Sequence, residues 1–406
     1  MKRRSTHILL ATMLTLMLCV IFTNCKDDND DVLIGNWVQM RDMFPLEERG
    51  GAVCFQIGET AYIGTGVNTY RTDVGDYFRN FASVTPDGNG GITWSSNWEG
   101  KGNEGISSMP DAAMARYGAV GFALNGKGYV GLGYTGEDCL RDFWEFDPAG
   151  TPSADQYTST MEQMRNDEAR ANVGTAATGR WSRIADFPGK ECRHAVAFVV
   201  HSNTTGKDYA YVGTGEDGIL NLDSTFYRFD GEKWEEAPAC SASRSKATSF
   251  VMNIDGIDYA YLYGGVGRDD VLCRLERFNA DTETWEDCSM GKDSANIALA
   301  GATSFVLPDR QKAYVTTGGA GYAGNSTWEY DHLENSWTQK TFFEGPVRCY
   351  ANSFVFQQPD IETGELKYVP YLTLGGSSSY INKNWGGRFF DDVWYFEPSQ
   401  DYDEHD

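Results

Sequence analysis

The sequence predicts an all-β protein made of six similar sheets that close into a ring. Composition is the first indication, because the 406 residues include 45 glycines and 14% aromatic residues, which favours many short strands over long helices. The second is a strand-forming run that ends in glycines, such as "DYAYLYGGVGRDD" at Asp258. Its six copies begin at Thr60, Lys127, Asp208, Asp258, Lys312 and Pro370. The third is spacing, because the last glycines of successive copies lie 50–82 residues apart, as expected for a repeat lengthened by insertions.

Each unit carries three further segments of strand composition. An apolar stretch comes before the glycine motif, as in "GAVCFQI" from Gly51 and "HAVAFVV" from His194. An aromatic stretch with an acidic residue comes after it, as in "DFWEFDP" from Asp142. A tryptophan follows in the first five units, at Trp94, Trp181, Trp234, Trp285 and Trp337. Four short strands per unit predict the blades of a β-propeller.

The two ends of the chain indicate how the ring closes. The sixth unit ends in "EPSQDYDEHD" without a tryptophan segment, and a spare segment, "GNWVQM", begins at Gly35. We expect the strand around Trp37 to pair with the sheet that contains Asp392 to Phe396, which leaves no open edge between the first and last blades. The glycines of each motif are expected to let the backbone turn where side chains would collide.

The glycine doublet, the aromatic–Asp pair and the following tryptophan resemble the marks of the kelch-repeat family, from Gly35 to Ser399. The resemblance implies a six-bladed kelch-type β-propeller closed by an N-terminal strand. More distant resemblances are to the N-acetylneuraminate epimerases and to the central domain of galactose oxidase. A copper site like that of galactose oxidase would need two histidines, two tyrosines and a tyrosine–cysteine cross-link. No metal-ligand spacing exists among His194, His201, His332 and His405, so we expect no metal and no cofactor.

The N-terminus is typical of an export signal. Basic residues from Lys2 to Arg4 precede an apolar stretch from Ile8 to Phe22, and Cys25 follows in "FTNCKDDNDD". Cys25 resembles the lipid-modified cysteine of bacterial lipoproteins, and the residues after it resemble the export signal of surface lipoproteins in Bacteroidetes. The alternative is an ordinary signal peptide with a polar linker. We predict a signal peptide over 1–24, a lipidated tether over 25–34, the propeller over 35–399 and an acidic tail over 400–406, with the protein held at the outer membrane or cell surface of a Gram-negative bacterium.

The chain is strongly acidic. Its formal net charge is −24, and loss of the three basic residues of the signal peptide takes it to −27. Such a charge repels nucleic acid and anionic membranes, so we expect no nucleic-acid partner and no membrane contact except through the lipid anchor. Seven cysteines follow Cys25, so at least one is free or pairs between molecules, and neither the disulfide pairing nor the oligomeric state can be predicted.

Five of the six units carry an arginine at the start of the apolar stretch: Arg49, Arg116, Arg193, Arg244 and Arg348. In a propeller these positions approach one mouth of the central channel. Guanidinium groups gathered there would form an anion site suited to a carboxylate. The alternative is structural, with each arginine bonded to backbone carbonyls or to acidic residues of neighbouring blades. The sequence leaves both interpretations open.

The loops after the glycine motifs supply a second candidate site. They combine aromatic rings with planar polar groups, which suits sugar rings. The ligand-binding candidates among them are Tyr70, Tyr134, Tyr322, Tyr380 and Trp385. An insertion between Pro148 and Arg180 is either a lid or docking piece or a solvated loop.

The sequence has no catalytic motif in a fitting context, whether a GxSxG elbow, a zinc motif, a Walker loop or a dinucleotide fingerprint. We therefore expect a non-catalytic lipoprotein of the cell envelope that binds a glycan or another envelope protein. The alternative, implied by the resemblance to N-acetylneuraminate epimerases, is a metal-independent sugar epimerase or mutarotase. Its acid/base residue would be Glu47, Glu48 or Glu191, each close in sequence to one of the arginines.

Overall fold

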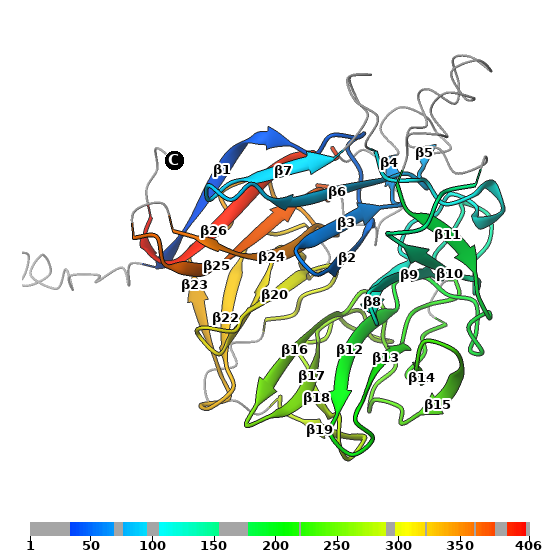
Figure 1. The fold of residues 1–406 in the computed structure, drawn as a ribbon. Helices are drawn as coiled ribbons and strands as arrows, with labels where there is room; N and C mark the ends of the chain where they lie inside the picture. The colour runs from blue at the N-terminus through cyan, green and yellow to red at the C-terminus, as the bar shows by residue number, and fades with distance from the viewer. Residues whose placement is uncertain are drawn as a thin grey trace, which may run out of the picture.

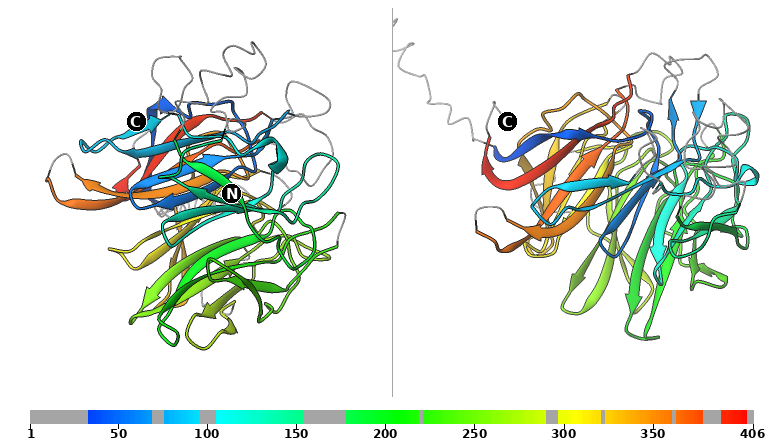
Figure 2. Two further views of the ribbon diagram at one scale, coloured as in Figure 1. Left: turned by 45° about the vertical axis from the view of Figure 1, so that its right-hand side comes forward. Right: turned by 45° about the horizontal axis from the view of Figure 1, so that its top comes forward.

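Six four-stranded antiparallel sheets lie around one central axis (Figure 1). The computed structural model describes residues 33–68, 76–95, 105–153, 178–218, 221–289, 297–320, 323–360, 363–377 and 388–402. The innermost strands contact each other in chain order around the axis, and the innermost strand of the last sheet contacts that of the first. The turned views show the same radial arrangement (Figure 2). The fold is a six-bladed β-propeller, so the predicted fold class is confirmed.

Each blade runs from an inner strand at the axis to an outer strand at the rim. Blade 1 contains β2 (Val53–Ile57), β3 (Thr60–Gly64), β6 (Phe81–Pro86) and β7 (Ile92–Ser95). Blade 2 contains β8 (Val120–Leu124), β9 (Lys127–Gly131), β10 (Phe143–Asp147) and β11 (Arg180–Arg183). Blade 3 contains β12 (Val196–Ser202), β13 (Lys207–Gly213), β14 (Phe226–Phe229) and β15 (Trp234–Ala237).

The remaining blades follow the same plan. Blade 4 contains β16 (Thr248–Ile254), β17 (Ile257–Tyr263), β18 (Leu275–Asn279) and β19 (Thr284–Asp287). Blade 5 contains β20 (Thr303–Leu307), β21 (Lys312–Thr316), β22 (Thr327–Asp331) and β23 (Ser336–Lys340). Blade 6 contains β24 (Asn352–Pro359), β25 (Leu366–Thr373), β26 (Asp392–Asp401) and β1 (Ile34–Met43).

Two small elements lie outside the blades. Strands β4 (Val67–Asn68) and β5 (Asp76–Tyr77) form a separate pair, and Asp111–Ala113 is a single 3-10 turn. Among the described residues, no helix is long and apolar enough to cross a bilayer. The seven cysteines of the described ranges are all free thiols.

The N-terminal strand closes the ring as predicted. β1 is the outer strand of blade 6, and Trp37 pairs with Phe396 of β26. The Trp37 side chain is fully buried and packs edge-on against Phe343, with ring centroids 5.1 Å apart. Its indole N–H donates a hydrogen bond to the Thr327 hydroxyl in blade 5, over 3.2 Å. The first strand of the chain therefore secures the last blade to its neighbour.

The hydrophobic core lies between blades and follows the strand pattern. In an inner strand such as β8, residues alternate between buried and partly exposed, because successive side chains point to opposite faces. A phenylalanine of each inner strand stacks on a tyrosine of the second strand, with centroids 5.0–5.4 Å apart. These pairs are Phe55–Tyr62, Phe122–Tyr129, Phe198–Tyr211, Phe250–Tyr261, Phe305–Tyr314 and Phe354–Tyr371.

One glycine of each motif joins its blade to the next, and we call these six the latch glycines. They have φ between +70° and +102°: Gly66, Gly133, Gly215, Gly265, Gly318 and Gly375. Each donates its N–H to a carbonyl of the following blade over 2.7–2.9 Å, and Gly375 of blade 6 donates to Arg49 of blade 1. A Cβ atom on Gly265 would lie 2.6 Å from the carbonyl oxygen of Ser245 in the same blade, so a side chain there would disrupt this turn. The turning role predicted for the glycines is therefore combined with blade-to-blade contact.

Candidate functional site

Four of the five predicted arginines are buried within the blades. Arg116 donates two hydrogen bonds to the Asp142 carboxylate, over 2.7 and 2.9 Å, and further ones to the carbonyls of Met114 and Leu132. Arg348 repeats the pattern with Asp392. None of the four guanidinium groups is exposed to solvent: Arg49, Arg116, Arg244 and Arg348.

The other two buried arginines use different partners for the same purpose. Arg49 bonds the Asn80 side chain over 2.7 Å and the Glu47 carboxylate over 3.0 Å, and Arg244 pairs with Glu276. Burial lowers the pKa of Arg49 to about 10, against the opposing effect of Glu47. All four side chains therefore make structural contacts of the kind that the sequence left open, although their side-chain partners lie in their own blade and not in a neighbouring one, and none of the four is exposed at the mouth.

Arg193 differs because it stands one residue later in its unit. Where four units have arginine three residues before an alanine, the third unit has Cys192, and its thiol bonds the Thr214 carbonyl over 3.8 Å. The partner position changes too, because Thr225 stands where Asp142 and Asp392 stand in other blades. Arg193 is therefore not a member of the arginine set, and its side chain is left for another role.

Large polar side chains project at the mouth from two neighbouring blades. Tyr117 of blade 2 forms a bridge with Tyr134, and Arg193 of blade 3 forms the equivalent bridge with Glu216. Small residues occupy the positions of Tyr117 and Arg193 in the other four blades: Gly50, Ser245, Ala300 and Cys349. The mouth is therefore asymmetric although the ring is built from repeats.

We call Tyr77, Tyr117, Tyr134, Arg193 and Glu216 the mouth cluster. Arg193 donates from Nε to Glu216 Oε1 over 3.1 Å and from Nη1 to the Tyr117 hydroxyl over 2.5 Å. Its Cζ lies 4.8 Å from the centroid of the Tyr134 ring, a cation–π contact. The Tyr77 ring lies 5.9 Å from that of Tyr117. The side chain of Arg193 keeps 22% of its surface exposed, and Tyr77 and Tyr134 are also partly exposed, whereas Tyr117 and Glu216 are buried beneath them.

The charges of Arg193 and Glu216 balance within the mouth cluster, and the neighbouring Lys246 adds a positive charge. Glu216 is largely buried and its two oxygens also accept hydrogen bonds from Ser245 and Lys246. One carboxylate thus faces two cations, Arg193 and Lys246, in a protein that is strongly acidic elsewhere. Burial, opposed by Arg193, raises the pKa of the Tyr117 phenol, which therefore stays protonated at neutral pH.

Beside the mouth cluster, six residues with left-handed backbones form a closed circle around the channel, which we call the channel circle. They have φ between +55° and +65°: Gly51, Gly118, His194, Lys246, Gly301 and Tyr350. Each donates its N–H to the carbonyl of its counterpart in the preceding blade, over 2.7–3.4 Å. The circle and the six alanines that follow its members line a cavity of about 130 Å³.

Two side chains of the channel circle that line this cavity contact each other. The rings of His194, from blade 3, and Tyr350, from blade 6, have centroids 5.0 Å apart. Burial holds the pKa of His194 well below its ordinary value of 6.5, and the nearby Lys246 and Arg193 lower it further. The imidazole is therefore neutral at pH 7.

The other predicted site residues are placed as follows. Tyr134 belongs to the mouth cluster, and four candidates lie outside the described residues, as does Cys25: Tyr70, Tyr322, Tyr380 and Trp385. The carboxylate of Glu47 bonds Arg49, that of Glu48 lies 3.5 Å from the Asn68 amide, and Glu191 is exposed. In the described part of the chain, no three His, Cys, Asp or Glu side chains are grouped to hold a metal ion.

A search of protein-family models finds no match for this chain. The fold and the site together define a six-bladed β-propeller with a polar, aromatic cluster on one side of its channel mouth.

Proposed function

We propose that the protein is a non-catalytic kelch-type propeller that binds a glycan at the mouth cluster. The observation that carries this proposal is the gathering of Tyr117, Tyr134 and Arg193 on blades 2 and 3, while the other blades have small residues at the positions of Tyr117 and Arg193. The glycine, aromatic–Asp and tryptophan marks of the repeats support the kelch assignment, together with the six-bladed ring.

The chemistry of the mouth cluster suits a sugar with an acidic group. Tyrosine rings stack on the apolar faces of sugars, and their hydroxyls bond sugar hydroxyls. Arg193 is partly exposed, and its Nη2 forms no hydrogen bond to a described residue, so it can donate to a carboxylate. Lys246 adds a second positive charge nearby.

The sugar epimerase alternative has less support. Glu216 is the carboxylate of the mouth cluster, and both of its oxygens already accept hydrogen bonds from protein donors. Such an arrangement favours an anchoring role over proton transfer. A mutarotation assay on N-acetylneuraminate with the purified full chain tests this alternative directly, because measurable catalysis would replace the binding proposal with the enzyme.

A glycan array probed with the full chain tests the binding proposal. A charge-assisted hydrogen bond contributes roughly 1.5–3 kcal/mol, so Arg193→Met should weaken an acidic glycan about tenfold or more. Arg183→Met is the matched control, because Arg183 lies exposed on β11 and pairs with Asp186. Capture of an envelope protein with no glycan bound, or equal affinity in both variants, would contradict the proposal.

We also propose that the protein is a lipoprotein of the outer membrane or cell surface, anchored through Cys25. The basic and apolar segments of residues 1–24 and the acidic stretch after Cys25 support this location. Cys25→Ala should move the protein from the membrane fraction to the soluble or secreted fraction. A variant that stays in the membrane fraction would show that the lipid anchor is not the attachment.

A further inference from the structure

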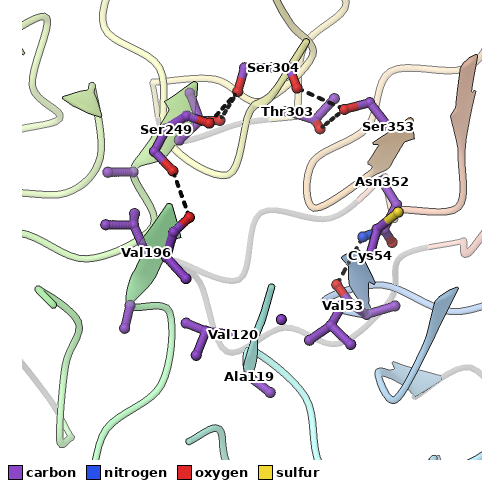
Figure 3. Close-up of a pocket in the computed structure, with 16 residues that line it drawn as sticks. Val53, Cys54, Ala119, Val120, Val196, Ser249, Thr303, Ser304, Asn352 and Ser353 are labelled. Carbon is purple, nitrogen blue, oxygen red and sulfur yellow. Dashed lines mark hydrogen bonds between the residues drawn. The ribbon is translucent and has the colours of Figure 1, made fainter. Parts of the chain in front are cut away.

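The channel below the channel circle has two chemically different halves. One residue of each inner strand faces the channel, and three of these on adjacent blades are serines: Ser249, Ser304 and Ser353. The corresponding residues of blades 1 to 3 are Cys54, Gly121 and Ala197. In the sequence the same division separates "ATSF", "ATSF" and "ANSF" from "AVCF", "AVGF" and "AVAF". Figure 3 shows the hydroxyl side chains along one arc of the channel and the valines along the other.

The hydroxyl hydrogens of the polar half are already used by the protein. The hydroxyls of Ser249, Ser304 and Ser353 donate to backbone carbonyls of the preceding blades, over 2.8–3.1 Å. Ser304 and Ser353 therefore accept, rather than donate, in their contacts with Thr248 and Thr303. What remains toward the channel is a set of oxygen lone pairs, so this half is a surface of hydrogen-bond acceptors.

Asn352 provides an independent indication of a missing donor. The residue is 7% exposed and lines the channel, and its side-chain amide nitrogen donates to the Ala52 carbonyl over 3.0 Å. Its amide oxygen is buried and has no hydrogen-bond partner. An unpaired buried acceptor costs about 1–3 kcal/mol, so a donor supplied from outside would relieve this penalty.

The apolar half, the lack of charge on the wall and the size of the cavity indicate that a ligand here has an apolar face, is neutral and is small. Val53, Val120 and Val196 line the opposite arc. The described residues that line the channel include no Asp, Glu, Lys, Arg or His, and burial raises the pKa of the Cys54 thiol to about 12, so that it stays neutral. A charged guest would lose its hydration without gaining a counter-charge, which is strongly unfavourable. The cavity of about 270 Å³ is near the lower limit for small-molecule sites, which sets a small ligand size.

We propose that the central channel is a second binding site, which takes a neutral polyhydroxylated molecule of the size of a single sugar ring. Its hydroxyl groups donate to the serine and threonine oxygens and to Asn352 Oδ1, and its C–H face packs on the three valines. This site uses none of the residues of the mouth cluster and takes a ligand of different charge.

The test uses the full chain with methyl-labelled valine and a panel of neutral monosaccharides, with N-acetylneuraminate as the charged comparison. A neutral sugar should shift the NMR methyl signals of Val53, Val120 and Val196, and N-acetylneuraminate should leave them in place. Thr303→Val keeps the shape of the side chain and removes one acceptor, so we expect about three- to tenfold weaker binding. Ala197→Met places a large side chain in the channel and should abolish binding.

Thr338→Val, the same exchange at an exposed threonine of β23, is the matched control for loss of a threonine oxygen. The proposal is overturned if no neutral sugar shifts the channel valines at millimolar concentration, or if Ala197→Met binds as tightly as the parent in a folded protein. The tests of the channel site and of the mouth cluster have independent outcomes. Neutral-sugar binding that is sensitive to Thr303→Val, without any acidic glycan bound, would support this site and contradict the proposed function of the mouth cluster.

Discussion

Replacing Arg348 by leucine should destabilise the ring strongly, because its buried charge holds together two strands of blade 6. The guanidinium is fully buried and bonds both oxygens of Asp392 over 2.6 and 2.7 Å, as well as the carbonyls of Pro346 and Leu374. Removing one partner of a buried ion pair typically costs about 3–5 kcal/mol, since the other charge stays behind unpaired. We expect the free energy of unfolding to fall by about that amount.

The chain itself supplies the compensating change. Blade 5 has Leu299 at the arginine position and Ser326 at the acid position, and it forms a regular blade. The double variant Arg348→Leu with Asp392→Ser should therefore be more stable than Arg348→Leu alone, by about 1–3 kcal/mol of coupling. Urea unfolding followed by tryptophan fluorescence measures both, with exposed Arg183→Leu as the control. A single variant that loses less than about 1 kcal/mol, or two changes whose effects simply add, would refute the ion-pair argument.

Two further predictions concern the closing strand and the buried histidine. Deleting residues 25–40 should lower the melting temperature of the whole ring. Trp37→Ala should lower the free energy of unfolding by about 3–5 kcal/mol, because Trp37 is fully buried between blades 5 and 6. An unchanged melting temperature in both variants would contradict the closure of the ring by β1. His194 takes up a proton near its ordinary pKa of 6.5 in the unfolded chain, whereas in the folded protein its pKa lies well below that value. The neutral, buried His194 therefore contributes fully to stability above pH 6.5, and this contribution is lost as the pH falls. Each pH unit below that value should cost up to about 1.4 kcal/mol until the folded pKa is reached. His194→Asn, which tolerates the left-handed backbone, should have a flatter stability profile between pH 6.5 and 5; parallel profiles would show that His194 does not titrate in this way.

The fold was predictable because every blade repeats the same local rules. The glycine with positive φ, the stacked Phe–Tyr pair and the tryptophan of the outer strand recur six times, so a weak signal in one unit is strengthened by the others. The closing strand was predictable for the same reason, because Trp37 is the tryptophan that the sixth unit lacks.

The mouth cluster was only partly predictable, because it consists of departures from the repeat. Arg193 precedes its alanine by two residues, whereas the other four arginines precede theirs by three, and that difference moves its side chain out of the blade. Tyr117 is not among the predicted site residues, since its place at the mouth becomes apparent only when its bridge to Tyr134 is seen. Aligning the units on the inner-strand phenylalanine would have exposed the displacement of Arg193.

The pairing of β1 with β26 also determines when the protein can finish folding. Within the described residues β1 pairs with β26 alone, and Trp37 is joined to Phe396 across about 360 residues of chain. At a synthesis rate of roughly 5–20 residues per second, the first strand waits about 20–70 s for its partner to emerge. Five blades can assemble during that interval, but the sheet edge that receives β1 does not yet exist. The last step of folding therefore unites segments that are synthesised far apart in time, and a chain that ends before Asp392, without β26, leaves β1 with no strand to pair with.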